Sequence, residues 1–385
     1  MQINEKVSEY LLELIRCGVS DAVPNEKPEG ISWKNVYDMA KNHSVSALCF
    51  RAVGKLKNLP EQELWKAWTE QNAKLLVKCV NQENEAVILS KAFEENRIPY
   101  MLLKGSVLRT LFRMPYLREM ADIDILISRD RKDDACEIAN SLGYQFISSV
   151  VHHVELQKPP YMTLELHTDL IGDIYEYYSY YQDPWCKAKL TYGSYGYSMS
   201  NEDFYLYLLT HSAKHYYNSG TGIRSVLDVY IFNRAYRSTM DMSYVDAELE
   251  KLNLSEFAAQ IEELAEYWFS PVRGTDSVQA KDMANYILSS ATYGTRNNRN
   301  ANIIRNYMKS GKSEKGAKAA MYLHMAFLPC DEMQLMFPVL KKAPVLLPFC
   351  WIARWFRIIF TKPKSITNSY KRVQDIQIYD SKKDS

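Results

Sequence analysis

Two aspartates at the head of an apolar stretch are the residues of this sequence whose types and spacing point most directly to chemistry. Asp122 and Asp124 open "DIDILI", and alternation along a strand places both on one face, with the isoleucines of the stretch on the other. Two like charges at this spacing repel each other and are costly to desolvate. Because a divalent cation compensates such a pair, and hard oxygen ligands suit Mg²⁺ or Mn²⁺, the pair predicts a metal site.

A third carboxylate lies on a later stretch. In "LELHTDL", residues 164–170, alternation places Glu165, His167 and Asp169 on one face and leucines on the other. Glu165 is the expected third ligand because it lies in the most strand-like part of this stretch. An isolated Asp-x-Asp pair is more often a strand end that reaches solvent, so the metal interpretation depends on the motifs that surround it.

Upstream of the acid pair, "LLKGSVLRTLF" is typical of a strand followed by a glycine, a small hydroxyl residue and a helix. Gly105 allows a phosphate to approach the backbone closely, and N–H groups at the start of a helix bind anions. Ser106 offers a hydroxyl, and Lys104 offers a positive charge unless it merely ends the strand. An anion site near a metal-binding acid pair predicts a nucleoside triphosphate, with metal ions activating the attacking hydroxyl and neutralising the departing pyrophosphate.

Short strands must position these motifs. The sequence predicts strands at "IPYMLL", "DIDILI", "YQFISS", "HHVELQ" and "YMTLELHTDL". A helix closed by Gly143 is expected after "DIDILI", and the Pro159-Pro160 pair predicts a turn between the last two strands.

Helices are expected on both sides of this small sheet. Apolar positions recur every three or four residues through residues 1–96, and again from Ser200, where Asp203 completes a capping box. We therefore expect four parts: an N-terminal helical region (1–80), an α/β core (81–199), a C-terminal helical region (200–360) and a polar tail (361–385).

The order of these motifs resembles the polymerase-β-like nucleotidyltransferase superfamily. The string "IPYMLLKGSVLRTLFRMPYLREMADIDILI" looks like the bacterial uncharacterised nucleotidyltransferase family, and "WKNVYDMAKNHSVSAL", "LELHTDL", "HSAKH" and "IRSVLDV" resemble its flanking motifs. The resemblance covers roughly residues 30–235. Two departures are Met114-Pro115, where Tyr-Pro is usual, and Thr168, where tryptophan is usual; neither changes an expected metal ligand.

The resemblance implies an α+β fold: a polymerase-β-like nucleotidyltransferase core, with a small mixed sheet and flanking helices, embedded in N- and C-terminal helical lobes. It implies that Gly105 and Ser106 hold phosphate and that Asp122, Asp124 and Glu165 bind metal. Glu165 would also act as the base toward the acceptor hydroxyl.

The expected function is Mg²⁺- or Mn²⁺-dependent transfer of a nucleoside monophosphate from a nucleoside triphosphate, with ATP as the expected donor, to an acceptor hydroxyl by a two-metal in-line mechanism. The acceptor is not identified, and a small molecule is favoured. Two alternatives are an inactive nucleotide-binding or regulatory module, and an RNA-modifying transferase. The RNA alternative depends on a basic run between Arg296 and Lys318, which by default is a solvated helix face.

Several further polar residues have two interpretations each. Arg118 either pairs with a carboxylate or contacts the triphosphate. His211 and His215, in "HSAKH", favour a core or interface pair, while the resemblance suggests nucleotide or substrate contact by His211 or Lys214. At most one of His152 and His153 can face the site from a strand. The tyrosine-rich stretch 174–185 favours a packed loop over a stacking surface.

The composition of the whole chain limits its setting. A net charge of +1 provides no global field for nucleic acid or anionic lipid. Seven cysteines without a CxxC motif argue against a disulfide framework or zinc ribbon, so we expect a reduced cytoplasmic protein. Stretch 343–360 is apolar, but Arg354 and Arg357 interrupt it. A packed amphipathic helix is favoured there over a membrane-surface contact, and a membrane span is not expected.

Overall fold

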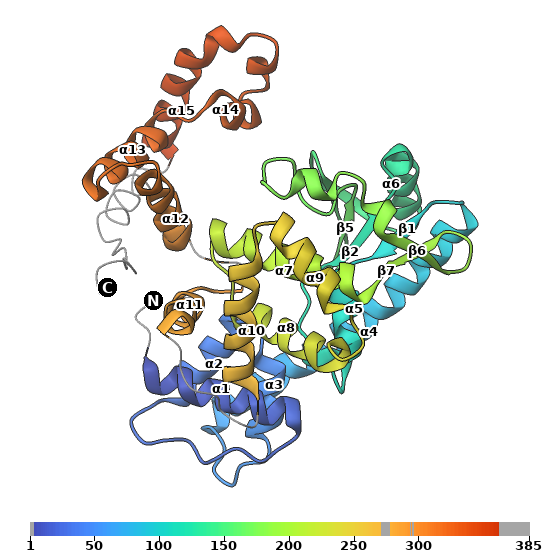
Figure 1. Ribbon diagram of the computed structural model, residues 1–385, viewed down its shortest axis with the longest axis vertical. Helices are drawn as coiled ribbons and strands as arrows, with labels where there is room; N and C mark the ends of the chain where they lie inside the picture. Colours follow the sequence, from blue (N-terminus) through green and yellow to red (C-terminus); the bar gives the residue numbers. More distant parts are fainter. Residues whose placement is uncertain (1–3, 271–277, 293, 295, 362–385) are drawn as a thin grey trace. The chain divides into compact units, whose positions relative to one another are not determined.

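A computed structural model describes residues 4–270, 278–292, 294 and 296–361 of the chain (Figure 1). Contacts divide it into two compact units, one of Met1–His215 with Thr221–Thr292 and the other of Tyr216–Gly220 with Tyr293–Ser385. The expected polar tail lies outside the described residues from residue 362 onward. The domain boundaries expected from the sequence stay predictions.

Four helices begin the first unit, as the helical period predicted. They are α1 (Glu5–Ser20), α2 (Trp33–Asn42), α3 (Ser46–Val53) and α4 (Gln62–Glu95). Side-chain caps start two of them: Asn4 accepts from the backbone N–H of Val7, and Ser32 accepts from that of Asn35. The indole of the fully buried Trp68, on α4, donates to the Ser46 hydroxyl at 2.9 Å and so ties α4 to the start of α3.

A seven-stranded mixed sheet follows, which confirms the α+β expectation. Its strands are β1 (Tyr100–Leu102), β2 (Ile123–Ile127), β3 (Gln145–Val150), β4 (His153–Lys158), β5 (Met162–His167), β6 (Ala188–Tyr192) and β7 (Gly196–Met199), in the order β3-β4-β5-β2-β1-β7-β6. The pairs β2–β5 and β1–β7 are parallel, and the other pairs are antiparallel. The five strands expected from the sequence are present, with Pro159-Pro160 in the turn before β5.

The hairpin of β6 and β7 was not expected. Its residues are mostly exposed or half-buried, so it lacks the alternation of buried apolar residues that marks a strand in a sequence. The hairpin joins the sheet through β7, which pairs with β1; Tyr100 of β1 lies opposite Gly196 of β7. Gly193, with a φ of +56°, makes the turn between the two strands.

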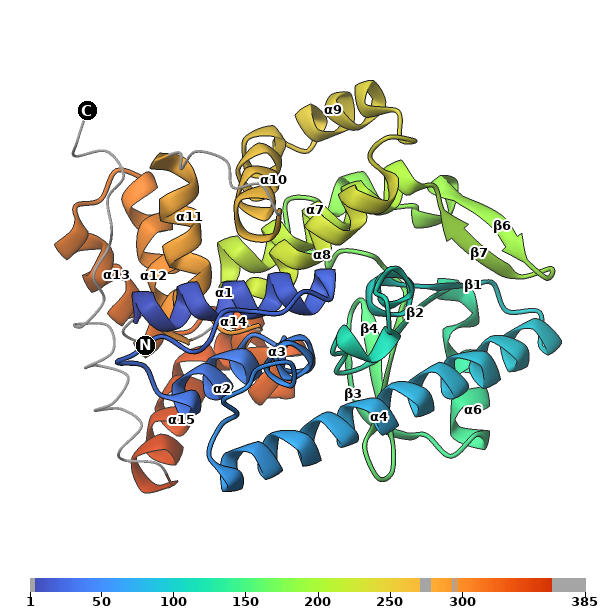
Figure 2. The same cartoon turned by 90° about the horizontal axis from the view of Figure 1, so that it is seen from below.

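The two faces of the sheet differ in polarity. Alternating residues of β2, β4 and β5 form an apolar face that packs against α4 and against α6 (Lys132–Ser141). The strand residues of this core are Ile123, Ile125, Ile127, Val154, Leu156, Leu164 and Leu166, and the helices contribute Leu89 and Ala135 among others. Figure 2 shows α4 running along the sheet near α6. The opposite face carries the acidic and histidine side chains, as alternation predicted for Asp124 and Glu165.

The connection between β1 and β2 differs from the expected helix. We expected a helix at "VLRTLF", but α5 spans Lys104–Leu108 and a 3₁₀ turn follows at Arg109–Leu111. The backbone N–H of Ser106 bonds to the carbonyl of Leu103 at 3.1 Å, and the helix begins at Lys104, three residues before the expected start at Val107. Gly105 and Ser106 therefore lie within the helix rather than before it. Short 3₁₀ turns also occur at Pro115–Leu117, Arg129–Arg131, Tyr178–Tyr181 and Pro184–Lys187.

Helices complete the first unit. They are α7 (Asn201–Asn218), α8 (Ile223–Tyr236), α9 (Met242–Lys251), α10 (Ser255–Phe269) and α11 (Val278–Ser289), the last three residues of α7 belonging to the second unit. The expected cap is present, because the Ser200 hydroxyl accepts from the backbone N–H of Asp203 at 3.1 Å. The rings of Tyr205 and Phe232 stack at 5.6 Å and join α7 to α8.

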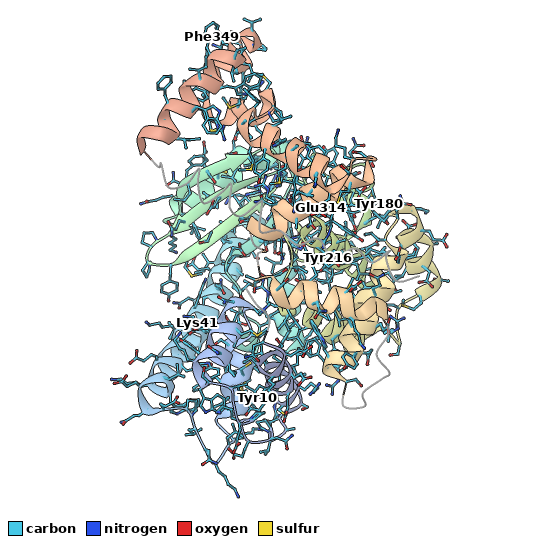
Figure 3. All side chains as sticks on the ribbon, turned by 90° about the vertical axis from the view of Figure 1, so that its left-hand side faces the viewer. Tyr10, Lys41, Tyr180, Tyr216, Glu314 and Phe349 are labelled. Atoms are coloured by element: carbon cyan, nitrogen blue, oxygen red, sulfur yellow. The ribbon has the colours of Figure 1, made fainter. Side chains whose placement is uncertain are left out.

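The tyrosine-rich stretch packs as a loop, as expected. Tyr181 is 2% exposed, and its hydroxyl lies 3.1 Å from Thr210 Oγ1 on α7. Tyr180, labelled in Figure 3, donates to Glu248 Oε2 on α9 at 2.5 Å and accepts from Lys187 Nζ at 2.7 Å. These contacts hold the stretch against the helices that follow the sheet.

The second unit contains α12 (Arg296–Lys309), α13 (Glu314–Ala326), α14 (Cys330–Met336) and α15 (Leu347–Thr361), with 3₁₀ turns at Pro338–Lys341 and Pro344–Leu346. The Trp351 and Trp355 indoles donate to the carbonyls of Leu328 and Ala326, so α15 packs near the end of α13. Phe349 (Figure 3) is 69% exposed, and a membrane-surface contact stays a hypothesis. None of the described helices combines the length and apolar character that crossing a membrane requires.

Candidate active site

Strand register brings two of the predicted carboxylates together. In the parallel pair of β2 and β5, Asp124 lies directly opposite Glu165, and Asp122 precedes Asp124 by two residues. The backbone N–H of Leu103 bonds to the carbonyl of Asp124 at 3.0 Å, which fixes the start of α5 beside the acidic end of β2. The strands thus position the acid pair, the third carboxylate and the "KGS" turn in one region of the sheet.

The electrostatics of Asp122 reflect this crowding. Burial, followed by repulsion from Asp124 and Glu165, raises the pKa of the Asp122 carboxyl to about 6, while Lys104 opposes the rise. A carboxyl with a raised pKa is one whose charge is incompletely compensated. The cluster therefore has room for further positive charge at Asp122.

Asp124 and Glu165 are compensated by cationic neighbours. Burial alone would raise the pKa of Asp124, but Lys104 and His167 hold it well below the usual range, with Asp124 Oδ1 3.8 Å from Lys104 Nζ and 2.8 Å from His167 Nε2. The pKa of Glu165 is also lowered: burial raises it, but the hydrogen bond to His167 together with the charges of His167 and His153 outweighs burial. Both carboxyl groups are consequently ionised at neutral pH.

His167 is a site residue whose role the sequence did not indicate. Its Nε2 lies 2.8 Å from Asp124 Oδ1 and 3.2 Å from Glu165 Oε2. Burial opposes the charged form, but the hydrogen bonds to the two carboxylates raise the pKa of His167. Alternation already placed His167 on the face of Glu165, which was the available signal. Asp169, the third residue of that set, instead forms an ion pair with Arg129.

The three predicted carboxylates do not form a close ligand group as they stand. Among the described residues, the close group of ligating side chains is His153, Glu165 and His167, whose ligand atoms all lie within 4.8 Å of one another. His153 pairs with His167 across β4 and β5, and their rings lie 5.3 Å apart. Burial lowers the pKa of His153, with Glu165 opposing the shift. His152 is not part of the group.

The start of α5 places Lys104 and Gly105 beside the acids. Lys104 Nζ lies 3.0 Å from His211 Nε2 and 3.8 Å from Asp124 Oδ1, so this lysine joins α7 to β2. A Cβ at Gly105 would lie 2.6 Å from Met120 Cγ, so any larger residue there would force the buried Met120 side chain to move. The structure thus gives a packing reason for Gly105. Phosphate contact by Gly105 and by the half-buried Ser106 stays a prediction.

Arg118 has a carboxylate partner. Its Nε and Nη2 donate to the two oxygens of Asp228, on α8, at 2.8 Å each, and the side chains of both residues are 6% exposed. This bidentate pair matches the structural interpretation of Arg118. Asp228 lies in "IRSVLDV", a motif that the sequence singled out without identifying the aspartate. The Nη1 of Arg118 faces Gly105, 3.2 Å from the position of a Cβ there.

α7 contributes a nitrogen-rich group to the same region. His215 Nε2 lies 3.1 Å from His211 Nε2, which in turn contacts Lys104. Burial and neighbouring lysines lower the pKa of His211 far below its usual value and that of His215 to about 3. Burial and Lys104 lower the pKa of Lys214 to about 8. The structure thus brings "HSAKH" to the acidic residues.

Lys78 was not expected from the sequence. It extends from α4 and its Nζ donates to the carbonyl of Ala121 at 2.8 Å, next to the acid pair. Burial lowers the pKa of Lys78, and Asp122 opposes the shift. A lysine on a long polar helix carries no sequence signal for such a position.

The chain has no match among curated proteins. Similar solved structures include the antibiotic-resistance factor ANT(2'')-Ia in solution (14% identity, 47% of this chain and 95% of that chain, TM-score 0.35) and the lincomycin-bound lincosamide antibiotic adenylyltransferase LnuA (18%, 39% and 96%, 0.28). Another is an antigenic nucleotidyltransferase-like protein from Paracoccidioides brasiliensis (17%, 46% and 91%, 0.28). Similarity at this level does not define a substrate for the present chain.

A family model gives the assignment. The model for the uncharacterised nucleotidyltransferases matches residues 29–270, which is more than half of the chain and includes every residue of the site described above. The chain therefore belongs to the uncharacterised nucleotidyltransferase family.

Proposed function

We propose that this nucleotidyltransferase is Mg²⁺-dependent and moves a nucleoside monophosphate from a nucleoside triphosphate, with ATP as the donor, to the hydroxyl of an acceptor. The observation that carries the proposal is the register of β2 and β5, which sets Asp124 opposite Glu165 with Asp122 two residues away. The raised pKa of Asp122, about 6, supports a site that needs an additional cation.

The donor set fits a hard divalent ion. Asp122, Asp124 and Glu165 supply carboxylate oxygens, the ligands that Mg²⁺ prefers, and Asp122 has the least compensated charge. When bound by a two-metal arrangement, Mg²⁺ would lower the pKa of the attacking hydroxyl and neutralise charge on the triphosphate. Asp122 and Asp124 would hold the ions, and Glu165 would complete the set.

Glu165 also suits the role of general base. Its pKa lies below the usual value, so it is ionised and able to accept a proton at neutral pH. Its contact with His167, at 3.2 Å, orients the carboxylate. A proton taken from the acceptor hydroxyl would thus reside on a Glu165 oxygen.

The basic residues suit a triphosphate. Lys104 Nζ lies 3.8 Å from Asp124 Oδ1, and Lys214 interacts electrostatically with Asp124 and Glu165, which supports phosphate contacts from α5 and α7. We assign backbone phosphate contacts to Gly105 and Ser106 and a contact with the nucleotide to His211. For Arg118 the pair with Asp228 favours positioning of the β1–β2 connection, with triphosphate contact as the alternative.

A small-molecule acceptor is proposed, because a net charge of +1 gives no general attraction for nucleic acid. A reduced cytoplasmic setting belongs to the same proposal and is supported by seven free cysteines. The RNA-modifying alternative would require salt-sensitive RNA binding.

The proposal is tested by incubating the protein with labelled ATP, Mg²⁺ and a broad extract of possible acceptors and measuring the release of labelled pyrophosphate. We expect release by the wild type and a loss of at least about a hundredfold in a D122N/D124N variant, because both ligands lose charge. Asp38→Asn is the matched control, since Asp38 is a partly exposed aspartate on α2 that pairs with Lys34, and its replacement should leave release unchanged.

Two outcomes would oppose the proposal. Equal release by the wild type and by D122N/D124N would show that these acids do not carry the reaction. Tight Mg²⁺-nucleotide binding by calorimetry, without turnover on any acceptor, would identify a nucleotide-binding or regulatory module instead.

A further inference from the structure

An all-oxygen Mg²⁺ site does not explain the two histidines, His153 and His167, that lie beside Glu165. His167 and His153 lie beside Glu165, on the same face of β4 and β5, and the ligand atoms of the three residues lie within 4.8 Å of one another. A Mg²⁺ site built from carboxylates needs no imidazole. The two histidines therefore require a separate account.

The spacing of His167 and Glu165 fits ligands of one ion. Ligand atoms about 2.1 Å from a six-coordinate ion and at right angles to each other are about 3.0 Å apart. His167 Nε2 lies 3.2 Å from Glu165 Oε2, close to this separation.

His153 supplies the third donor. Its Nδ1 is buried and has no hydrogen-bond partner within the described part of the chain. Buried polar atoms in folded proteins are nearly always satisfied, so an unpartnered nitrogen on a ring that belongs to a group of ligating side chains indicates a ligand.

We propose that His153, Glu165 and His167 form a metal position for a borderline divalent ion of the Zn²⁺ or Co²⁺ type, adjacent to the acid pair of Asp122 and Asp124. Two imidazoles and one carboxylate are a donor set that selects such ions over Mg²⁺. Three protein ligands leave coordination positions open, as in catalytic rather than structural zinc sites.

This inference rests on the proposed function in one respect, because Glu165 is shared by the two positions. In this arrangement the two ions differ: the acid pair takes Mg²⁺, and the histidine position takes the transition ion. Full activity would then require both metals rather than excess Mg²⁺ alone.

A competing account needs no transition ion. A protonated His167 donating to both Asp124 and Glu165 would itself neutralise the carboxylates. In that account His153 contributes nothing to metal affinity, because the imidazole that bonds to the acids is that of His167. The two accounts therefore differ in the effect of changing His153.

Calorimetry of the full chain with Co²⁺ and with Mg²⁺ tests the proposal. We expect Co²⁺ to bind more tightly than Mg²⁺ by about tenfold or more. His153→Gln and His167→Gln should each weaken Co²⁺ binding by about 10–100-fold, and His153→Gln should leave Mg²⁺ affinity nearly unchanged. His152→Gln is the matched control, because His152 is the neighbouring histidine outside the ligand group. Unchanged Co²⁺ affinity in His153→Gln would overturn the proposal.

X-ray absorption of the wild type loaded with Zn²⁺ provides a test that needs no variant. Scattering from two imidazoles is expected, and an oxygen-only shell would overturn the proposal. Failure here is distinguishable from failure of the proposed function: pyrophosphate release with Mg²⁺ and an oxygen-only Zn²⁺ shell reject only the histidine position. A Zn²⁺ shell with two imidazoles, in a protein that releases no pyrophosphate, would reject only the proposed nucleotidyl transfer.

Discussion

Replacing Asp228 by asparagine should destabilise the first unit strongly. Asp228 is the bidentate partner of Arg118, with two contacts of 2.8 Å between side chains that are each 6% exposed. Asparagine keeps the size of the side chain and removes its charge, so the Arg118 cation is left buried without its carboxylate. Breaking one side of a buried ion pair typically costs about 3–5 kcal/mol.

Urea unfolding followed by circular dichroism measures this cost. With a slope of about 1–3 kcal/mol per molar urea, the midpoint should fall by about 1 M or more. Asp246→Asn, at an exposed position on α9, is the matched control and should change stability by less than about 0.5 kcal/mol. A loss below about 1 kcal/mol in Asp228→Asn would refute the reasoning, because the Arg118 charge would then be compensated elsewhere.

A double variant separates the two roles of Arg118. Replacing Arg118 by methionine together with Asp228 by leucine removes both charges, and such replacements of a buried pair are often neutral or stabilising. Stability should therefore recover relative to Asp228→Asn. If nucleotide affinity also equals that of the wild type, Arg118 is a positioning residue. If stability recovers and affinity does not, Arg118 contacts the triphosphate.

Three further predictions concern the acidic region. Gly105→Ala should lower the free energy of unfolding in urea by about 1–3 kcal/mol, because its Cβ overlaps the Met120 side chain. The same change should cost less in a Met120→Ala background, and an unchanged midpoint in Gly105→Ala would contradict this packing account. Because the pKa of Asp122 is raised to about 6 in the folded state, the free energy of unfolding of the metal-free wild type should fall by up to about 3 kcal/mol as pH rises from about 4 to about 7. The fall should be smaller in Asp122→Asn, and parallel plots of stability against pH for the two proteins would contradict this prediction. Because Lys214 has a pKa of about 8, it should lose its charge between pH 7 and 9, and the affinity for nucleotide measured by calorimetry should fall over this range. Lys214→Arg keeps its charge and should retain the affinity; an equal fall in both proteins would exclude contact between Lys214 and the nucleotide.

The sequence predicted the strands of the site because they carry a regular pattern. Alternation in β2 and β5 assigned Asp124 and Glu165 to the polar face and the isoleucines and leucines to the core, as observed. The Ser200 cap was equally readable, because a cap depends on residues three positions apart. The β6–β7 hairpin was missed, since exposed strands lack a buried face to impose a pattern.

The pattern of residues in the sequence did not reveal contacts between residues that are far apart along the chain. Arg118 and Asp228 are 110 residues apart, and periodicity indicates which face a residue occupies without identifying the side chain opposite it. Lys78 reaches Ala121 from a helix whose polar residues carry no distinguishing spacing. Such contacts follow from how the helices pack on the sheet, which the local pattern of residues does not determine.

The position of Glu165 shows why this limit matters for function. Alternation gave Glu165 and His167 the same face, and it was therefore consistent with either an oxygen-only or a mixed ligand set. The pairing of β4 with β5 adds His153 opposite His167, so Glu165 lies between an acid pair on β2 and two imidazoles. A carboxylate shared in this way couples the two sides, because a charge bound on one side reduces the demand for charge on the other. The identity of the metal at this site should therefore depend on the histidines as much as on the aspartates.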